Sequence, residues 1–513
     1  MIHMKILSNL LRTVVPRSVY GNADIVVMSI EHDSRKCGAD SLFIAIKGTT
    51  TDGHNFIHTA IQNGAKAIIC EYLPDILHDD VVYVTVDNSR QYAADIAHEF
   101  YDYPANRLKI IGVTGTNGKT SVTFILRNLL EASGYKCGII GTTGNYIGNH
   151  YLPTSYTTPE APELVQLLHQ MVSEGIDYVC MEVSSHALVM QRVRGVYFTA
   201  ALFTNLTHDH LDFHGSMQEY AKAKKILFDM LSADAIAVVN SDSEYAKVMI
   251  KDTKAKTFFV GMEHNCDTHI HSVYTALSGS DFSLTFGAKH RKRVDAAFSM
   301  PLVGFFNIEN AALCIALAFE LGIECQYIQE IAPTLRGAPG RMESLAIPSG
   351  AIAIIDYAHT PDALEKVLHS CRHILQTLTK NTGKIITVFG CGGDRDKEKR
   401  PLMGNIASQL SDYVIITNDN PRTELPETIA DDILKGFTRM LPTEIIIDRK
   451  RAVYFALSVA SYGDIILIAG KGHESTQIIG TIHYHSNDSE IVKEYILNSS
   501  LSSPQSTIIQ RNS

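Results

Sequence analysis

Hydrophobic and polar positions along this chain follow two recurring patterns, which predict buried strands and amphipathic helices. Residues 107–115 (RLKIIGVTG) form a short apolar run, as in a buried strand. From Thr120 to Ser133 apolar residues recur at helical spacing, and Gly134 stands where a helix would end. Strand and helix patterns alternate as far as residues 235–240 (AIAVVN). This alternation predicts a mostly parallel sheet with helices on both faces.

A second alternating series begins after a hinge rich in Gly and Pro, RGAPGRME (336–343). Its predicted strands are AIAIID, KIITVFG, YVIIT, TEIII and DIILIAG. Ahead of the first series, short β-like pieces such as SLFIAIKG and AKAIIC stand within residues 1–105. We therefore expect an α/β protein with domains at 1–105, 106–335 and 336–513. The central one is predicted to be a P-loop parallel-sheet domain, and the last a Rossmann-like doubly wound domain.

Composition narrows the class of protein. Of the 513 residues, 45% are hydrophobic and 19% charged, which is typical of globular proteins and excludes disordered, collagen-like and coiled-coil classes. The net charge of −10 disfavours nucleic acid as a partner. The chain lacks an apolar stretch long enough for membrane insertion. Nine cysteines without a C-x-x-C pair favour a reducing cytoplasm.

The segment 114–120 (TGTNGKT) lies between a predicted strand and a predicted helix. Glycines at a helix N-terminus let backbone N–H groups converge on phosphate oxygens. Lys119 is then expected at the β/γ-phosphates, and the Thr120 hydroxyl at Mg²⁺. Val113 occupies the position of the first Gly in the general P-loop pattern, so this is a variant loop. The alternative is a Gly-rich turn that binds no ligand.

Two further segments carry groups that suit a metal ion. Glu182 ends the predicted strand 177–183 (DYVCMEV), and the carboxyl ends of parallel strands face the ligand crevice. Its alternative role is a hydrogen-bonded edge carboxylate. Residues 208–214 contain three His and two Asp, but Phe213 breaks the spacing of the zinc-hydrolase pattern H-x-H-x-D-H. For most of these histidines, ordinary hydrogen bonding is the expected role.

The segment that follows is predicted to be a helix. Ser216 and Glu219 form a capping box, which indicates that the helix begins at Ser216. Lys222, Lys224 and Lys225 fall in its second and third turns. Lysines on a helix usually form a solvated face, so the pattern alone does not single one out.

Ten motifs stand in the order and spacing found in Mur ligases, and the chain resembles this family from about Ser29 to Gln477. It is most similar to the ligases that add a diamino acid to UDP-N-acetylmuramoyl-L-alanyl-D-glutamate. The motifs are TGTNGKT, MEVSSH, NLTHDHLDFHG, YAKAKKILF, PLVGFFNIENA, APGRME, IDYAHTPDAL, GCGGDRDKEKRPLMG, DNPRTE and GKGHE. The resemblance implies an N-terminal domain for the UDP-linked substrate, a central ATP-binding domain and a C-terminal domain for the amino acid.

The resemblance also implies a reaction, an ADP-forming ligation in cytoplasmic peptidoglycan precursor synthesis that proceeds through an acyl phosphate. It implies ATP, two Mg²⁺ ions and a carbamate formed from CO₂ on Lys224. The implied catalytic residues are Lys119, Glu182, His210 and Lys224, and the implied metal ligands are Thr120, Glu182, His210 and Lys224. The implied ATP-binding residues are Gly115, Thr116, Asn117, Gly118, Lys119, Thr120, Ser121, Asn307, Asn310, Arg341, Asp356, Tyr357 and His359.

Two more sets of residues are implied for the other substrates. Those at the UDP-linked substrate are Ser34, Thr49, Thr50, Thr51, Tyr156, Thr157, Thr158, Ser184 and Arg192. Those at diaminopimelate are Arg395, Asp419, Asn420, Pro421, Arg422, Gly470 and Glu474. Two positions depart from the family pattern: Tyr156 stands where Asn often precedes the two Thr, and Met190 stands where Gln is common.

The choice of amine depends on Arg422 in the segment 419–422 (DNPR). A guanidinium makes a forked contact with a carboxylate, so Arg422 favours meso-diaminopimelate over L-lysine. The alternatives are the same step with L-lysine, where Arg422 forms an ordinary ion pair with Glu424 or Glu427, a folylpolyglutamate synthase, or a P-loop ATPase acting as a switch. The expected partners are the UDP-N-acetylmuramoyl dipeptide and meso-diaminopimelate, and the protein is expected to be a monomer.

Overall fold

The structure is a computed structural model that describes residues 3–48, 51–154, 156–276, 279–287, 289, 292–379 and 383–501. Contacts divide the chain into two compact units. The first comprises residues 1–206, 210–260 and 316–323, and the second comprises residues 207–209, 261–315 and 324–513. Among the described helices, none is long and apolar enough to cross a membrane.

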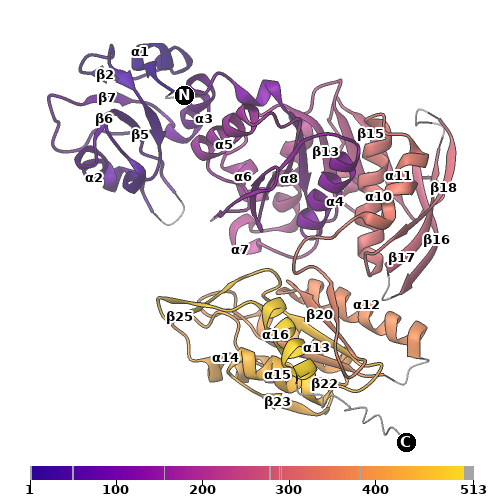
Figure 1. Cartoon of the computed structure of the whole chain (residues 1–513). Helices are drawn as coiled ribbons and strands as arrows, with labels where there is room; N and C mark the ends of the chain where they lie inside the picture. The colour runs from indigo at the N-terminus through magenta and orange to yellow at the C-terminus, as the bar shows by residue number, and fades with distance from the viewer. Residues whose placement is uncertain are drawn as a thin grey trace, which may run out of the picture. The chain divides into compact units, whose positions relative to one another are not determined.

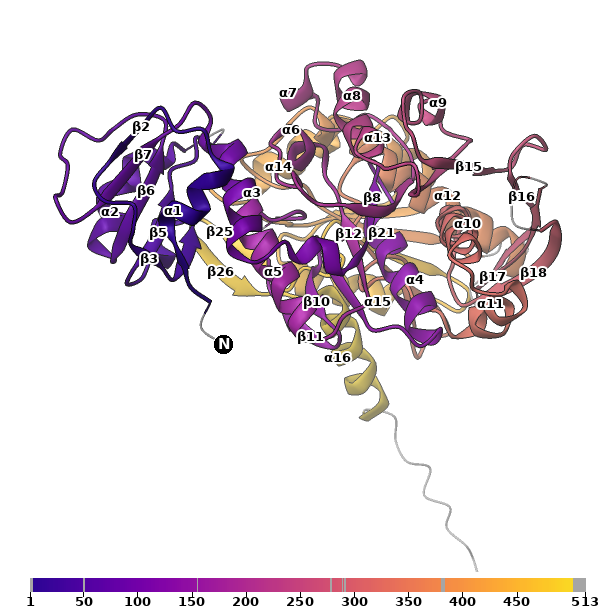
Figure 2. The ribbon, with the colours of Figure 1, turned by 90° about the horizontal axis from the view of Figure 1, so that it is seen from above.

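The first unit opens with a five-stranded sheet in the order β2-β7-β6-β5-β4 (Figure 2). Strands β4 to β7 pair in parallel, and β2 pairs antiparallel with β7. Their bounds are Ser18–Tyr20 (β2), Ser29–Glu31 (β4), Ser41–Ile44 (β5), Ala65–Cys70 (β6) and Val82–Thr85 (β7). The accompanying elements are β1 (Lys5–Ile6), α1 (Leu7–Leu10), β3 (Val26–Val27), α2 (Ile57–Gln62) and α3 (Ser89–Phe100).

The rest of this unit contains eight strands of an eleven-stranded sheet, in the order β11-β10-β9-β12-β8-β13-β14-β15. The neighbours β9-β12-β8-β13-β14-β15 pair in parallel, and β10 pairs antiparallel with both β9 and β11. The strands are β8 (Lys109–Thr114), β9 (Cys137–Gly141), β10 (Gly144–Ile147), β11 (His150–Leu152), β12 (Tyr178–Glu182), β13 (Phe198–Phe203), β14 (Ile236–Asn240) and β15 (Lys256–Gly261). The helices are α4 (Lys119–Ala132), α5 (Ala161–Ser173), α6 (Ser185–Val189), α7 (Leu211–His214), α8 (Met217–Asp229) and α9 (Ala246–Met249).

The hydrophobic pattern explains why α4 forms where it does. The apolar residues of this helix share one face and are fully buried, namely Val122, Ile125, Leu126, Leu129 and Leu130. Gly134, with φ +89°, follows its end in the left-handed conformation that glycine adopts without strain. β8, the strand before it, is central and buried, so the β8–α4 loop is held at the carboxyl edge of the sheet.

The second unit includes three antiparallel strands, β16 (Thr268–Ala276), β17 (Gly279–Phe286) and β18 (Val294–Met300). The chain continues through α10 (Phe305–Glu320), whose residues from 316 onward belong to the first unit, and α11 (Cys325–Ile331). The strand and helix patterns did not predict β16 to β18. Thr268 and Thr275 are buried in β16, so its inward face contains polar residues and lacks the apolar alternation typical of a strand.

The remaining sheet has the order β19-β20-β24-β21-β22-β23, parallel except for the edge strand β19. Its strands β20, β22 and β23 are labelled in Figure 1. The strands are β19 (Glu343–Ala346), β20 (Ile352–Asp356), β21 (Ile385–Phe389), β22 (Tyr413–Ile416), β23 (Thr443–Ile445) and β24 (Ile465–Ala469), and a hairpin follows of β25 (Thr476–Ile479) and β26 (Ile482–His485). The helices are α12 (Pro361–Thr379), α13 (Lys399–Leu410), α14 (Pro426–Leu434), α15 (Arg449–Val459) and α16 (Asp488–Leu501).

Two separate hydrophobic clusters cover the two faces of this sheet. One contains residues of α12, α13 and α14, and the other contains residues of α15 and α16. Helices on both faces of a parallel sheet make this a doubly wound fold. The predicted fold class, α/β with a parallel P-loop sheet and a doubly wound C-terminal sheet, is confirmed.

Candidate active site

The loop between β8 and α4 has a backbone conformation that requires glycine. Gly115 has φ +148°, and a Cβ atom there would lie 1.9 Å from Thr204 Oγ1. The N–H groups of Thr116 and Asn117 donate to the backbone and side-chain oxygens of Asn205, at 2.9 and 3.0 Å. The residues that follow β13 therefore hold the loop at the N-terminus of α4, where N–H groups and the helix dipole favour an anion.

Lys119 is the first residue of α4, and its side chain folds back over this loop. Its Nζ donates to the carbonyl oxygens of Gly115 and Thr116, at 3.0 and 2.8 Å. Gly118, which precedes it, adopts φ +88° and allows the chain to enter the helix sharply. The ammonium is thus held where it would face a phosphate bound by the loop.

Glu182, the last residue of β12, connects the start of α4 with the residue that follows β9. The carboxylate is 1% exposed and accepts hydrogen bonds from Thr120 Oγ1 at 2.9 Å and from Thr142 N and Oγ1, both at 3.0 Å. A Cβ atom at Gly141 would lie 2.4 Å from Glu182 Oε1, so glycine is needed for this approach. Hydroxyl and carboxylate oxygens are ligands that Mg²⁺ prefers, and the Thr120–Glu182 pair fits such an ion.

Lys224 is distinguished from the other lysines of α8 by its burial. It is 1% exposed, its Nζ donates to Gly115 O at 2.7 Å, and it lies 4.6 Å from the centre of the Tyr220 ring. Lys222 and Lys225 instead form ion pairs with acidic residues, Lys222 with Glu219 at 2.7 Å. The Ser216 side chain accepts from Glu219 N as the predicted cap of this helix.

His210 precedes α7 in the left-handed conformation, with φ +53°, and lies among other rings. Its ring centre is 4.9 Å from that of His186, and His214 Nε2 is 2.9 Å from Ser185 Oγ. Burial, reinforced by the neighbouring His210, lowers the pKa of His186 to about 4. Across the described residues, no group of three or more His, Cys, Asp or Glu side chains is arranged to hold a metal ion.

The residues predicted for the peptide arm of the substrate gather beside Glu182. Thr158 Oγ1 donates to Glu182 O at 2.8 Å and accepts from Ser184 N at 3.1 Å. Arg192 Nη1 donates to Thr158 O at 2.9 Å. Thr157 Oγ1 lies 3.0 Å from Thr142 Oγ1, which itself bonds Glu182. One continuous set of hydrogen bonds therefore joins these residues to the phosphate loop.

The two positions that depart from the family pattern both contact Arg192. The guanidinium lies 4.8 Å from the centre of the Tyr156 ring, and its Nη2 is 3.6 Å from Met190 Sδ. The same guanidinium forms an ion pair with Glu160 at 2.8 Å. An aromatic ring and a thioether thus pack against a cation at these two positions.

Fewer contacts define the predicted uridine side. Ser34 is buried, and its carbonyl accepts from Asn63 Nδ2 at 2.9 Å. Thr51 O accepts from Gly48 N at 2.8 Å, whereas the predicted residues Thr49 and Thr50 lie outside the described residues. In the second unit, Asn307 and Asn310 are buried on α10.

The loop after β20 brings the predicted nucleotide residues of the second unit together. The guanidinium of Arg341 lies 4.5 Å from the centre of the Tyr357 ring. Asp356 accepts from the N–H groups of Met342 and Ala358, both at 2.8 Å, and burial raises its pKa. His359 Nδ1 is 2.9 Å from Tyr357 O, and burial, with Lys399 nearby, lowers the His359 pKa to about 4.

A cavity of about 560 Å³ opens beside residues of the segment 336–344. Asn307, Arg341, Gly472 and His473 are among the residues that line it. The predicted nucleotide residues Asn307 and Arg341 thus share a cavity large enough for a small organic ligand.

The loop 419–422 presents Arg422 in a strained conformation. Arg422 has φ +52°, unusual for a residue with a side chain, and its Nη1 donates to Gly393 O at 2.7 Å. A Cβ atom at Gly392 would lie 3.1 Å from Arg422 Nη1 and 3.8 Å from Arg395 Cγ, so both arginines flank Gly392. Glu424 pairs with Arg400 and Lys397, at 2.9 and 3.1 Å, and the ion pair considered for Arg422 and Glu424 is not the contact observed.

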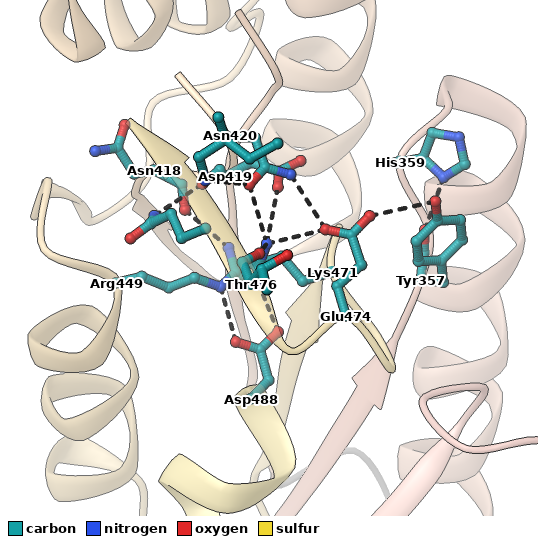
Figure 3. Close-up of polar contacts among 12 residues, drawn as sticks. Tyr357, His359, Asn418, Asp419, Asn420, Arg449, Lys471, Glu474, Thr476 and Asp488 are labelled. Atoms are coloured by element: carbon teal, nitrogen blue, oxygen red, sulfur yellow. Dashed lines mark hydrogen bonds and ion pairs between the residues drawn. The ribbon is translucent and has the colours of Figure 1, made fainter. Parts of the chain in front are cut away.

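Asp419, Asn420 and Glu474 lie together at the ends of β22 and β24 (Figure 3). Asn420 Nδ2 donates to Glu474 Oε2 at 3.1 Å, and Tyr357 Oη lies 3.5 Å from Glu474 Oε1. Gly470, with φ +112°, donates its N–H to Asp356 O at 3.1 Å. The predicted amino-acid residues are thereby joined to the predicted nucleotide residues within the second unit.

Comparison with known proteins places this geometry in a family. Three family profiles match: the Mur ligase family catalytic domain at residues 26–101, the Mur ligase middle domain at 113–318 and the Mur ligase glutamate ligase domain at 340–472. Relatives named UDP-N-acetylmuramoyl-L-alanyl-D-glutamate--2,6-diaminopimelate ligase are 40% identical in Clostridium tetani, over 93% of this chain and 96% of the relative, and 41% identical in Cytophaga hutchinsonii, with the same shares covered. The chain belongs to the Mur ligase family.

Solved structures agree with this assignment. A structure with the same printed name superposes with a TM-score of 0.66 at 32% identity, covering 96% of this Mur ligase and 99% of that chain. A folylpolyglutamate synthase from Mycobacterium tuberculosis superposes with a TM-score of 0.57 at 16% identity, covering 81% of this chain and 95% of that one. At that identity the likeness shows a shared fold alone.

Sequence reasoning missed two residues of this Mur ligase that the structure places at the centre of its contacts. Thr142 bonds both Glu182 and Thr157, and Lys471 bonds both Asn420 and Glu474. Thr142 stands in a Gly/Thr-rich turn, GTTG (141–144), that offers no chemical signal of its own. Lys471 lies inside the GKGHE motif, but a lysine is normally expected to be solvated.

Proposed function

We propose that this Mur ligase joins meso-2,6-diaminopimelate to UDP-N-acetylmuramoyl-L-alanyl-D-glutamate, converting ATP to ADP and phosphate. The observation that carries the proposal is a phosphate loop bonded through Glu182 to Thr142 and Thr157, in a chain that also holds two arginines around Gly392. The relatives that bear this name match over nearly the whole chain. The reaction belongs to peptidoglycan precursor synthesis in the cytoplasm, and the enzyme acts as a monomer.

Each of the three domains binds a different substrate. Residues 1–105 hold the UDP-linked end of the substrate, residues 106–335 hold ATP, and residues 336–513 hold the amino acid. The family profiles, which break between 101 and 113 and between 318 and 340, support boundaries near 105 and 336.

The first chemical step activates the D-glutamate side chain. A carboxylate oxygen attacks the γ-phosphorus of ATP, ADP leaves, and an acyl phosphate forms. Lys119, held over the loop by two backbone carbonyls, offsets the negative charge that develops on the transferring phosphoryl group. The amine then attacks the acyl carbon, inorganic phosphate leaves, and the amide nitrogen loses a proton.

Thr120 and Glu182 would hold one Mg²⁺ ion, and His210 and carbamylated Lys224 would complete the ligands for two. When bound, Mg²⁺ would supply positive charge against the phosphate oxygens. The buried Lys224 amine, 2.7 Å from Gly115 O, adds CO₂ with loss of a proton and so becomes an oxygen ligand. The fit of the Thr120–Glu182 pair to Mg²⁺ supports this assignment.

The amine is selected by its far carboxylate. The side chains of Arg422 and Arg395 both approach Gly392, and two arginines in one place suit a carboxylate that L-lysine lacks. Leaving a guanidinium without its charged partner costs ~2–5 kcal/mol. We therefore expect meso-diaminopimelate to be preferred over L-lysine by at least ~10²-fold in kcat/KM.

The test is ADP release with the UDP-linked dipeptide and a panel of amino acids, using Arg422→Ala and the matched variant Arg439→Ala. Arg439 also donates to a backbone carbonyl, Ser411 O at 2.9 Å, but it lies outside the predicted pocket. Arg422→Ala should lose most of the preference, and Arg439→Ala should keep it. Equal use of both amines by the unmodified enzyme would overturn the choice of amine. Repeated turnover of ATP without any amine, beyond one ADP per enzyme, would overturn the ligase itself.

A further inference from the structure

Lys471 is a fully buried lysine at the centre of the amino-acid pocket (Figure 3). Its Nζ donates to Glu474 Oε2 at 2.9 Å, to Thr476 O at 2.6 Å and to Asn420 Oδ1 at 3.3 Å. An ammonium group has three N–H donors, and these three acceptors account for all of them. The acceptors come from the loop after β22, the loop after β24 and the start of β25, so Lys471 connects three segments.

This arrangement determines which way the Asn420 amide faces. Asn420 Oδ1 accepts from Lys471 Nζ and also from Ile478 N at 2.9 Å, and both partners are donors only. The Nδ2 group must therefore point the other way, toward Glu474 Oε2 at 3.1 Å. Both ends of the Asn420 side chain are thus committed to partners within the protein.

The same contacts fix Glu474. Oε2 accepts from both Lys471 and Asn420, while Oε1 meets Tyr357 Oη at the longer distance of 3.5 Å. The Glu474 side chain is 30% exposed, whereas that of Lys471 is 0% exposed. Oε2 is therefore held by two donors, whereas Oε1 has only the long contact with Tyr357 among the contacts described.

The side chains around Lys471 carry one more negative charge than positive charge, which would suit one more cation. Asp419 Oδ1 is 3.7 Å from Lys471 Nζ and, among the described residues, is a buried oxygen without a hydrogen-bond partner. Asp419 and Glu474 together carry two negative charges against the single positive charge of Lys471. Arg449 pairs with Asp488 at 2.7 Å and also interacts electrostatically with Asp419 and Glu474, so these three carboxylates face two cations.

We propose that Lys471 is a positioning residue that orients Asn420 and Glu474 so that Glu474 Oε1 receives an ammonium group of the amino-acid substrate. This inference rests on the proposed function, because that function places the amine in this pocket. Lys471 itself does not touch the substrate, since all its donors are engaged within the protein.

The test compares Lys471→Met with Arg449→Met in the full-length enzyme. Arg449 is also a buried cation, and it joins the same two loops through Asn418 O and Ala469 O, both at 3.0 Å, without bonding a pocket side chain. Lys471→Met should raise KM for meso-diaminopimelate at least ~10-fold, because a tenfold change corresponds to about one lost hydrogen bond. The KM for ATP should change less than ~2-fold. Arg449→Met should lower the unfolding temperature without a selective rise in the amine KM.

A double-mutant cycle with Glu474→Gln keeps the proposal testable if Arg449→Met fails to fold. If Lys471 acts through Glu474, adding Lys471→Met to Glu474→Gln should raise the amine KM much less than it does in the unmodified enzyme. Equal effects in both backgrounds, or a fall in kcat with every KM unchanged, would overturn the positioning role. A wild-type enzyme that uses no diamino acid would instead overturn the proposed function.

Discussion

In the first unit, the two lysines predicted to act at the phosphate loop are positioned by hydrogen bonds to neighbouring residues. Gly115 O accepts from both Lys119 and Lys224, so a single carbonyl gathers two ammonium groups at the phosphate loop. The motif TGTNGKT predicted Lys119 directly, because its chemistry depends on local spacing. Lys224 could be selected only by resemblance to a family, since its burial depends on how α8 packs and three lysines share that helix.

Lys119→Ala should lower the rate of ADP release by at least ~10²-fold, the usual loss when one preorganised charge is removed. The side chain donates to two carbonyls of its own loop, which stay in place without it, so the fold should persist. Steady-state kinetics and circular dichroism check the two parts. Near-normal turnover would show that the loop is not the phosphate site.

Lys224→Ala should be inactive and should regain part of its activity when short carboxylates are added, because they replace the missing oxygen ligands. Lys224→Arg should stay inactive, since a guanidinium cannot form the carbamate and remains cationic. Lys222→Ala is the matched control, because Lys222 pairs with Glu219 at the surface of the same helix. An active Lys224→Arg variant would show that only positive charge or packing matters there.

At the scale of elements, the strands that end in functional loops were predictable and the connecting hairpins were not. β8, β12, β20 and β24 are apolar runs with buried residues throughout or nearly so, which is the pattern of a parallel sheet. The hairpin of β25 and β26 is largely exposed, so its sequence carries no burial pattern. The contacts of Arg422 with Ile478 and Gly480 could therefore not be anticipated.

The loop after β20 should make stability depend on pH through His359. The folded-state pKa of about 4 lies below the ordinary value of 6.5, so between these values the unfolded chain binds a proton that the folded chain does not. The free energy of unfolding therefore falls as the pH drops through this window. Asn at this position can still donate to Tyr357 O but does not titrate.

When the pH is lowered from about 7 to about 5, the free energy of unfolding of His359→Asn should rise relative to that of the wild type by on the order of 1–2 kcal/mol. Urea unfolding at the two pH values measures the difference. His369→Asn is the control, because that histidine is largely exposed on α12. If the free energy of unfolding rose by the same amount in both variants, the pH dependence could not be assigned to His359.

At the scale of the whole molecule, all nine cysteines are free, and all but Cys266 are buried. Burial raises the pKa of Cys70, Cys137, Cys371 and Cys391 to about 12, which keeps these thiols protonated. Since the thiolate is the reactive form, their reaction with reagents should be slow in the folded protein. The number and spacing of the cysteines could be read from the sequence, but their burial depends on packing within each unit.

An aromatic disulfide reagent should therefore label one thiol quickly in the native enzyme and all nine in guanidinium. Cys266→Ser should remove the fast phase and leave the slow phase unchanged, as followed by absorbance. Several fast thiols in the native enzyme would mean that the cores open more readily than their burial indicates.

The bonds around Glu182 have a thermodynamic consequence. One carboxylate contacts Thr120 on the nucleotide side and, through Thr142, Thr157 on the peptide side. Under the proposed function, a ligand that orders either side lowers the entropy cost of ordering the other. Linkage then requires that ATP and the UDP-linked dipeptide change each other's affinity by the same factor. Under the proposed function we therefore expect heterotropic cooperativity between the two substrates through this shared side chain.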